Sequence, residues 1–599
     1  MSIVKNLFLW VLKIFQNAIN VVFTLIALVI LLAVLSGVMA ALTQKGLPAG
    51  TVLTLDARGG FSDQPAMAGF PGFSGAPPSV VETVLALDRA ENDDRIAGLY
   101  MRIGGGGIPY AAAQELRQSI AAFRAAGKFV IVHAQSFSSN GLTDYYLASA
   151  ADEIWLQPGT EVNMAGVASA TLFMRGLFDK IEAKPQIEQR YEFKNAANVY
   201  TQSDYTDAHR EATTRLMQSL YDTATAEIAA SRGMNTEQFV ALLNGAPHLS
   251  DEALANKLID HLGFDDDAEK AATDRAGTEE EPLSLVAYYM EEGGSRYTVP
   301  FGADATIALV LGEGAIVDGS GASDPFGGES MMGGDSIAQA IRDATEDEDV
   351  KAIVFRVSSP GGSAIASDQI LDAIRKAQAA GKPVVVSMGT VAASGGYYVS
   401  LSADKIYAQP TTITGSIGVL SGKLAIGDSY ALVGLNYRTL SVGGPLATMN
   451  LDGQPYTEEQ LAALRKQGDQ IYRDFTGKVA EGRKLPIEKV LEIARGRVWT
   501  GTDAKERGLV DEFGGLRDSL AAARQLAGIA DDAKLNVKVY PAPKTPFEAI
   551  AAFFGGAHTA VYVLAALEPL IDSDAGKALM GLVREEEEPA MRMTPIMVR

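Results

Sequence analysis

The distribution of hydrophobic residues divides the chain into an apolar N-terminal segment and a long body. No charged residue occurs from Ile14 to Gln44, and the stretch from Val21 to Leu42 is almost entirely apolar. A run of this length is enough to cross a hydrocarbon core of about 30 Å. Lys5 and Lys13 precede the run, which predicts a cytoplasmic N-terminus and a body on the other side of the membrane.

The alternative for this segment is a cleaved signal peptide. The small residues at 38–41 could form its cleavage site. The apolar run is longer than the hydrophobic region of a typical signal peptide, which favours a retained anchor over residues 1–45. In a bacterium with two membranes, the anchor would lie in the inner membrane and the body in the periplasm.

The body alternates short apolar strands with helical patterns, which predicts an α/β fold. Ala352–Val357 and Pro383–Met388 are two such strands, rich in β-branched residues. A helix is predicted over 364–380, between the two strands. Long helical patterns cover 206–232 and 457–484, and further helical stretches cover 235–263 and 485–514. The charged segment 265–281 is predicted to be a mobile linker.

A set of short phrases occurs twice in the body. The first copy holds Arg102, Gly127-Lys128, Tyr145-Tyr146 and Ala151-Asp152; the second holds Arg356, Gly381-Lys382, Tyr397-Tyr398 and Ala403-Asp404. The copies are 254 residues apart up to the Gly-Lys pair and 252 apart from the Tyr-Tyr pair onward. This regularity indicates a duplicated domain, with the first repeat at 46–300 and the second at 301–545.

Two segments lie outside this regular pattern. Residues 319–335 form a Gly/Ser-rich loop with Met331-Met332, which we expect to border a substrate cleft. Residues 546–599 comprise an apolar segment, interrupted by Glu548, Glu568 and a glycine pair, and then an acidic tail. The interruptions favour a packing or amphipathic segment over a second membrane span.

Composition narrows the classes of function. The chain has 51 Lys and Arg against 73 Asp and Glu, a formal charge of −22, so nucleic acid is not an expected partner. It has no cysteine, which excludes thiol catalysis, cysteine-ligated zinc and disulfides. The run at 104–107 lacks the Lys-Ser/Thr of a phosphate-binding loop. We therefore expect neither a metal nor another cofactor.

The chemistry of the second repeat centres on Ser394, in the phrase Ala-Ala-Ser-Gly-Gly-Tyr-Tyr. Its neighbours have almost no side chain, and it lies between a predicted strand and a helix expected to begin near Tyr397. A serine at such a turn exposes its Oγ near free backbone N–H groups, which suits a nucleophile. The alternative is an ordinary helix-capping serine.

A second turn, Ser358 to Ser363, follows the preceding strand. Its Pro-Gly-Gly presents bare backbone N–H groups at Gly361 and Gly362, which suit an oxyanion hole together with the N–H of Gly395. The alternative is a plain strand-to-helix turn.

The phrases SSPGGS, AASGGYY and TGSIGV together resemble the signal peptide peptidase family, also called protease IV, in its long two-repeat form. These are membrane-bound serine proteases of the Clp/crotonase-like superfamily. The resemblance implies that Ser394 is the nucleophile, that Gly361, Gly362 and Gly395 form the oxyanion hole, and that Ser416 orients the base. It also implies a homotetramer whose substrates are apolar peptides, the signal peptides left in the membrane after secretion.

A serine nucleophile needs a base, and none of the five histidines lies between Phe301 and Gly555. A lysine can serve if burial or nearby positive charge keeps it neutral. The resemblance implies Lys194, in Tyr-x-x-Lys-small, although Asn195 stands where the family usually has serine. The matching stretch of the second repeat, 441–446, has no lysine.

The first repeat, in turn, has no match for the nucleophile. The place of Ser394 falls near Asn140 or Leu142, and we interpret the nearby Ser138 and Ser139 as loop residues. One repeat would keep the base and the other the serine, which requires the two repeats to pack face to face. Two other functions remain open: binding of acyl-CoA thioesters, as in crotonases, and a catalytically inactive membrane-anchored scaffold.

Overall fold

The computed structural model describes residues 47–65, 77–138, 141–291, 304–321 and 331–541. The expected anchor at 1–45, the middle of the loop at 319–335 and the C-terminal segment at 546–599 lie outside these residues. None of the helices in the described part of the chain is both long and apolar enough to cross a bilayer.

The first repeat is built on a six-stranded sheet in which every neighbouring pair is parallel. Its core strands are buried apolar runs, as expected for strands covered on both faces. The strands lie in the order β8 (His261–Leu262), β4 (Glu153–Leu156), β3 (Phe129–Ala134), β2 (Ile96–Ile103), β1 (Thr51–Asp56) and β9 (Leu283–Ser284).

The second repeat is built on an eight-stranded sheet that is parallel except for one pair. The main path is β18 (Val498–Thr500), β16 (Ile413–Gly415), β14 (Val384–Ala393), β13 (Val350–Ser359), β10 (Ala305–Glu313) and β20 (Leu535–Tyr540). β15 (Lys405–Ala408) branches from β14 and pairs with β19 (Glu512–Phe513). The α/β class is therefore confirmed.

The registers of the two sheets confirm the duplication. Leu99 pairs with Val130 in the first sheet, as Ile353 pairs with Val384 in the second, and both pairs are related by 254 positions. The pairing of β1 with β2 has one irregularity, after Thr51, and that of β10 with β13 has its counterpart after Thr306. The assignment to the Clp/crotonase-like superfamily remains a prediction.

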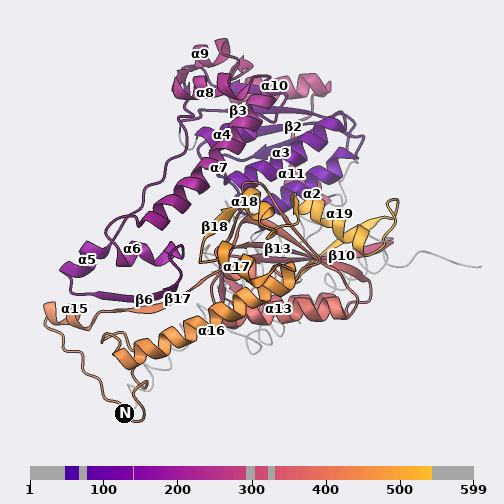
Figure 1. Ribbon diagram of the computed structural model, residues 1–599. Helices are drawn as coiled ribbons and strands as arrows, with labels where there is room; N and C mark the ends of the chain where they lie inside the picture. Colours follow the sequence, from indigo (N-terminus) through magenta and orange to yellow (C-terminus); the bar gives the residue numbers. More distant parts are fainter. Residues whose placement is uncertain (1–46, 66–76, 139–140, 292–303, 322–330, 542–599) are drawn as a thin grey trace, which may run out of the picture.

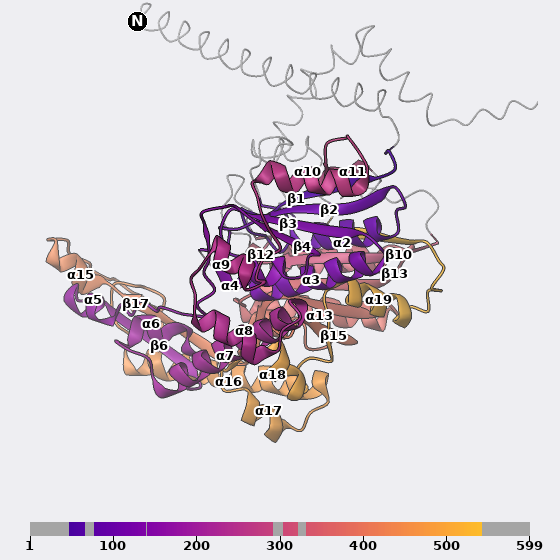
Figure 2. The ribbon, with the colours of Figure 1, turned by 90° about the horizontal axis from the view of Figure 1, so that it is seen from above.

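The two repeats pack as stacked layers (Figure 2). Between the sheets lie α2 (Val80–Glu91) and α3 (Tyr110–Ala125) of the first repeat and α19 (Leu516–Leu526) of the second. One buried core includes Leu53, Leu309 and Leu516, which come from both sheets and from α19. On the far face of the second sheet, α12 (Gly334–Glu346) and α13 (Ala364–Ala379) enclose a separate core.

The prediction of a mobile linker at 265–281 was wrong, because residues 265–276 form the helix α10 (Asp265–Ala276). Acidic residues in the first turn favour a helix through the macrodipole, and the Asp267 carboxylate accepts the N–H of Phe264. Ala268 and Ala272, four residues apart, are buried against the outer face of the first sheet. The high charge of this segment concealed its small apolar stripe.

An arm projects from the stacked sheets and joins the repeats a second time (Figure 1). Its centre is an antiparallel pair formed by β6 (Lys184–Arg190) of the first repeat and β17 (Val419–Ala425) of the second. The arm includes the long helices α7 (Asp207–Ser231) and α16 (Glu458–Arg483). The hydroxyls of Thr206 and Thr457, the residues directly before them, cap their N-termini. The arm also holds α5 (Arg175–Lys180), α6 (Asn198–Thr201) and α15 (Gly427–Leu432).

Candidate functional site

Ser394 lies between the end of β14 and the helix α14 (Gly395–Tyr398). The helix begins at Gly395 and not near Tyr397, so Ser394 directly precedes its N-terminus. Its backbone, with φ 54° and ψ −116°, is in a region that a residue with a side chain rarely adopts. Such strain concentrates at functional sites, and here the N–H of Ser394 is fixed by the carbonyl of Gly415 at 2.8 Å.

Lys194 reaches Ser394 from the first repeat. It follows β6 and directly precedes the short helix η1 (Asn195–Ala197), and only 5% of its surface is exposed. Its Nζ lies 2.8 Å from Ser394 Oγ, 2.9 Å from Ser416 Oγ and 2.9 Å from the Ser416 carbonyl oxygen. The fold thus brings together Lys194, Ser394 and Ser416 from segments about two hundred residues apart.

The surroundings of Lys194 favour its neutral form. Burial lowers the pKa of Lys194 from 10.5 to about 7. A neutral amine has two N–H donors and one lone pair. The Ser416 carbonyl can only accept a hydrogen bond, and Ser416 Oγ can accept the second N–H, so the lone pair is left for the Ser394 hydroxyl.

The segment Arg495–Arg497, which the sequence analysis did not single out, holds this arrangement in place. The Arg495 carbonyl accepts the N–H groups of Tyr191 and Phe193, each at 3.2 Å. The Arg497 carbonyl accepts the N–H of Ser416 at 2.7 Å. Three residues of the second repeat therefore position both the lysine segment and the Ser416 segment.

Gly496 leaves the space that Lys194 needs. Its φ is +81°, and a methyl group on it would lie 2.5 Å from Lys194 Cβ and 2.6 Å from the Lys194 backbone nitrogen. Both facts require glycine at this position. A lone glycine in Ala-Arg-Gly-Arg was the only signal available in the sequence.

The glycine turn 360–363 places the N–H of Gly362 close to Gly395, the residue that follows Ser394. Ile316 of β11 (Ala315–Val317) bonds to the Gly361 carbonyl and to the Ser363 N–H, at 2.9 and 2.8 Å. Because main-chain groups alternate sides along an extended segment, the N–H of Gly362 points away from β11. A methyl group on Gly395 would lie 3.1 Å from the Gly362 nitrogen, so these two residues are in close approach.

The N–H groups of the three glycines predicted to form the oxyanion hole are not equally free to bind a substrate oxygen. The Gly361 N–H already donates to Ser359 Oγ at 3.1 Å. Within the described residues, no acceptor bonds to the N–H of Gly362 or of Gly395. A methyl group on Gly361 would lie 2.6 Å from the Gly395 nitrogen, so Gly361 supplies the close packing between the two donors.

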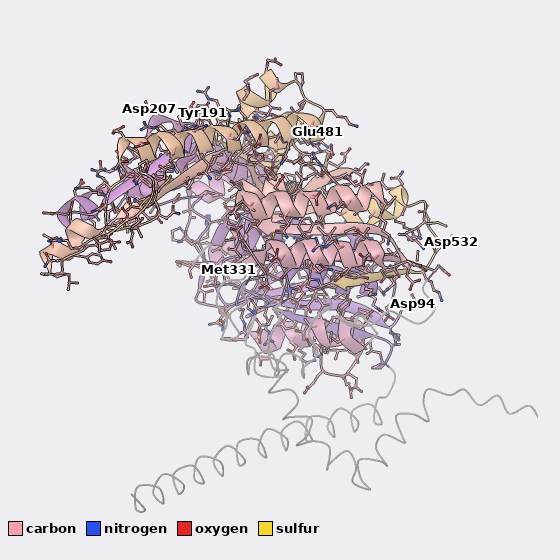
Figure 3. The ribbon with its side chains drawn as sticks, turned by 90° about the horizontal axis from the view of Figure 1, so that it is seen from below. Asp94, Tyr191, Asp207, Met331, Glu481 and Asp532 are labelled. Atoms are coloured by element: carbon pink, nitrogen blue, oxygen red, sulfur yellow. The ribbon has the colours of Figure 1, made fainter. Side chains whose placement is uncertain are left out.

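The described end of the loop at 319–335 lies beside this turn. Met331–Gly333 forms β12, which pairs with β11, and Ile316 of β11 in turn pairs with Gly362. Met331 is 47% exposed on the side of the body that faces the arm (Figure 3). Met332 is buried beneath it.

The matching turn of the first repeat, residues 104–108, is occupied by a side chain. The buried Asp144 carboxylate accepts the N–H of Gly105 at 3.1 Å and that of Ile108 at 3.4 Å. Burial raises the pKa of the Asp144 carboxyl, and the two hydrogen bonds oppose that rise. The 254-residue offset equates Ile108 with Gly362.

The place of Ser394 in the first repeat is taken by a buried leucine. The Tyr-Tyr pairs, 252 residues apart, equate Leu142 with Ser394. Ser138 Oγ contacts only Ser136 Oγ, at 2.9 Å, among the contacts of the described residues, and it is exposed. Ser139 and Asn140 lie outside the described residues.

The histidine of the first repeat that the strand β3 carries lies away from the site. His133 is 2% exposed, and its Nε2 lies 3.3 Å from the Gly263 carbonyl on the outer face of the first sheet. In the described ranges, no three His, Asp or Glu side chains are grouped so that they could hold a metal ion.

A buried ion-pair cluster fixes the two repeats together near the site. Arg356 of β13, 1% exposed, lies 2.6 Å from Asp63 and 2.8 Å from Glu115, both in the first repeat. Ser387 accepts a further bond at 2.9 Å. The matching Arg102 is 28% exposed and lies 3.5 Å from Asp56 and Asp265 of its own repeat.

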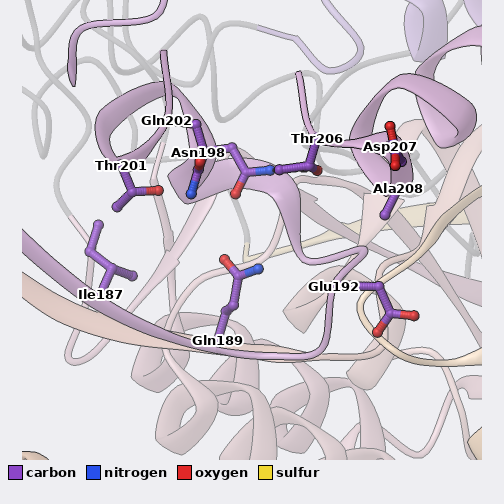
Figure 4. Close-up of a pocket in the computed structure, with 9 residues that line it drawn as sticks. All are labelled: Ile187, Gln189, Glu192, Asn198, Thr201, Gln202, Thr206, Asp207 and Ala208. Atoms are coloured by element: carbon purple, nitrogen blue, oxygen red, sulfur yellow. Dashed lines mark hydrogen bonds between the residues drawn. The ribbon is translucent and has the colours of Figure 1, made fainter. Parts of the chain in front are cut away.

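A polar pocket of about 440 Å³ lies in the arm next to the lysine segment (Figure 4). Glu192 and Asn198, which line it, stand on either side of Lys194 in the sequence. None of the predicted site residues lines this pocket.

Comparison with known proteins agrees with the duplication. The model of peptidase family S49 matches residues 122–279 and 376–530, one match in each repeat. The chain is 34% identical over 464 residues to Protease 4 of Salmonella typhi, covering 75% of this chain and 72% of that protein. It is 30% identical over 508 residues to a chloroplastic serine protease SPPA of Arabidopsis thaliana, covering 84% and 73%.

Protease 4 of Haemophilus influenzae is 31% identical over 474 residues, covering 76% of this chain and 74% of that protein. These matches extend across both repeats. With a family match in each half and relatives of this length, the chain belongs to peptidase family S49, in the long form that carries two copies of the domain.

Proposed function

We propose that the protein is a serine endopeptidase in which Ser394 is the nucleophile and Lys194 the general base. One observation carries this proposal: a buried lysine, with no acidic partner among the contacts of its Nζ, lies 2.8 Å from a serine hydroxyl at a helix N-terminus. A lysine held near neutrality is a competent base at physiological pH. The membership of a peptidase family supports the same reaction class.

In the first step Ser394 Oγ attacks the carbonyl carbon of the peptide bond while its proton moves to the Lys194 amine. The carbonyl oxygen becomes an oxyanion and is stabilised by the N–H groups of Gly362 and Gly395. Lys194, now an ammonium, keeps its two bonds to Ser416. The role of Ser416 is to fix the rotation of the amine so that its lone pair faces Ser394.

In the second step the C–N bond breaks, and Lys194 gives its proton to the leaving amine. The acyl group stays on Ser394 Oγ as an ester. Water then attacks this ester with Lys194 as base, which releases the acid product and restores the hydroxyl. Lys194 therefore acts once as base and once as acid in each half of the cycle.

The substrates proposed are apolar peptides, in particular signal peptides remaining in the membrane after secretion. Ile365, at the start of α13, is 75% exposed three residues after Gly362. Met331 is exposed on the neighbouring ribbon. These two side chains offer an apolar surface beside the glycine turn that suits an apolar peptide.

The proposed location follows from the N-terminal segment. Residues 1–45 would anchor the chain in the inner membrane of a bacterium, with the catalytic body in the periplasm. There the enzyme would meet signal peptides that remain in the membrane after secretion.

We also propose that the chain assembles as a homotetramer through the arm. The arm exposes many apolar side chains, including Leu172, Leu177, Val433, Leu435, Leu440 and Val442. Leu440 and Val442 are fully exposed in the single chain. Because isolated soluble chains rarely leave so many apolar groups in water, a second copy of the arm is a fitting cover. Light scattering of the detergent-solubilised chain should give four subunits.

The direct test of the reaction is Ser394→Ala. This variant should lose peptide cleavage while its melting temperature stays within about 2 °C of the parent, since one partly buried hydroxyl is removed and no apolar core side chain is changed. Mass spectrometry should find a serine-directed acylating probe attached to Ser394 in the parent. Normal turnover by the variant would refute the assignment, and a parent that resists every such probe would favour the inactive scaffold.

A further inference from the structure

The glycine-rich turn of the first repeat keeps the form of an anion-binding site. Gly104, Gly105 and Gly107 have φ values of +117°, +90° and +66°, which only glycine adopts readily. The N–H groups of Gly105 and Ile108 converge on the same carboxylate. Successive backbone N–H groups arranged in this way form a concavity that suits an anion.

Asp144 fills this concavity from α4 (Gly141–Ala148) and is only 1% exposed. Its carboxylate accepts the two backbone N–H groups, and within the described residues no Lys, Arg or His forms an ion pair with it. The N–H of Ile108 is the counterpart of the N–H of Gly362. The Asp144 carboxylate therefore stands, in the first repeat, where the oxyanion of a substrate would stand in the second.

The backbone of the turn takes a different course in the two repeats, and this difference makes room for the Asp144 carboxylate. In the second repeat a methyl group on Gly396 would lie 2.5 Å from the carbonyl oxygen of Ser359, so no side chain fits there. In the first repeat the counterpart of Gly396 is Asp144, and the counterpart of Ser359 is Gly105. Gly105 and Ser359 both have a main-chain carbonyl, so the space for Asp144 comes from the different backbone of Gly105, whose φ of +90° Ser359 does not adopt.

We infer that the first repeat contains a closed anion site whose permanent occupant is Asp144, and that this site binds small carboxylates such as formate once the Asp144 side chain is removed. The inference does not rest on the proposed peptidase reaction, because it concerns only the turn 104–108 and α4. Its ligand class follows from the site: a monoanion with two oxygens and the size of the missing carboxylate.

The experiment compares the melting temperature of Asp144→Ala in sodium formate and in sodium chloride of equal concentration. The variant should melt below the parent in chloride, because the N–H groups of Gly105 and of the buried Ile108 lose their acceptor. Formate at ten times its dissociation constant should raise the melting temperature of the variant by about 2 °C over chloride. The parent, whose site is filled, should show no such difference.

The matched control is Leu142→Ala, which opens a cavity on the same helix without backbone N–H donors. It should be destabilised and should not respond to formate. If Asp144→Ala does not fold in chloride, its refolding yield in the two salts replaces the melting temperature, and a higher yield in formate is expected. Equal behaviour of Asp144→Ala in formate and in chloride would overturn the inference.

Discussion

The two glycine turns of this protein occupy matching places in the two repeats, but among the described residues the N–H of Gly362 is free in one turn and the N–H of its counterpart Ile108 is bonded in the other. In the second repeat the N–H groups of Gly362 and Gly395 lie close to Ser394 and meet no acceptor among the described residues. In the first repeat the N–H groups of Gly105 and Ile108 are taken by the buried Asp144 carboxylate. A turn that no longer meets a substrate must satisfy its buried polar groups internally, and one side chain does so.

The segment that carries Lys194 and its counterpart at 441–446 differ in the opposite sense, because here it is the first repeat that holds the proposed functional residue. In the first repeat the segment after β6 folds back over the second repeat and buries Lys194. In the second repeat the matching segment, 441–446, lies on the arm with Val442 fully exposed. Each repeat thus keeps one half of a site, and the pairing of β6 with β17 brings the halves together.

The largest effect on the reaction rate is expected from a substitution at Lys194. Lys194→Ala should lower the rate of Ser394 acylation by about a thousandfold or more, because the serine loses its proposed base. Lys180→Ala, on α5 of the same arm, removes an exposed lysine and is the matched control. Stopped-flow measurement of acylation with a chromogenic ester gives both rates. Equal rates for the two variants would show that the base lies elsewhere.

The next largest effect is expected at the open turn. Gly362→Ala places a methyl group 2.0 Å from the Ile316 carbonyl oxygen and displaces the N–H that lies close to Ser394. The turnover number should fall about a hundredfold or more, as when one oxyanion donor is lost. Gly105→Ala in the closed turn strains a backbone at φ +90° but should leave kcat unchanged. A loss of kcat in both variants would mean that the first turn also serves catalysis.

Ser416 should have a smaller effect, because it acts through Lys194. Ser416→Ala removes one of the two acceptors of the neutral amine and leaves the backbone carbonyl. We expect kcat to fall about ten- to a hundredfold, with KM little changed and with a shifted midpoint in the pH–rate profile. Ser416→Thr, which keeps a hydroxyl, should recover part of the rate. An unshifted midpoint would make Ser416 a packing residue only.

Arg356 and its counterpart Arg102 should differ in their contribution to the free energy of unfolding, which can be measured without an activity assay. Arg356→Met strands the carboxylates of Asp63 and Glu115 inside the protein and should cost about 3–5 kcal/mol. Arg102→Met removes a half-exposed arginine with long contacts and should cost about 1 kcal/mol or less. Urea denaturation measures both. Similar losses would show that the buried cluster does not join the repeats.

Much of this arrangement could be read from the sequence where the signal was local. Strand-to-helix turns mark Ser394 and the Pro-Gly-Gly turn, and the doubled phrases reveal the two repeats. Lys194 could be singled out only through the family resemblance, since a lysine in an irregular segment has no pattern of its own. The α10 helix was missed because three aspartates at its start hid an alanine stripe.

The remaining features are long-range contacts for which the sequence holds no local signal. Arg495–Arg497 supports Lys194 across three hundred residues, and Asp63 meets Arg356 across 293. Asp144 sits in an ordinary helical phrase, and its role depends on Gly105, 39 residues earlier. These partners become visible only when the two sheets are stacked.

The measurement that tests the central claim most directly is the pH dependence of Ser394 acylation. Lys194 must be neutral to accept the serine proton, and burial lowers its pKa to about 7. The account therefore predicts a rate that is low at pH 5, rises through a midpoint near pH 7 and is constant above pH 8.5, with the rise absent in Lys194→Ala. A profile that is flat over this range, or a midpoint near the ordinary lysine pKa, would contradict a dyad shared between the two repeats.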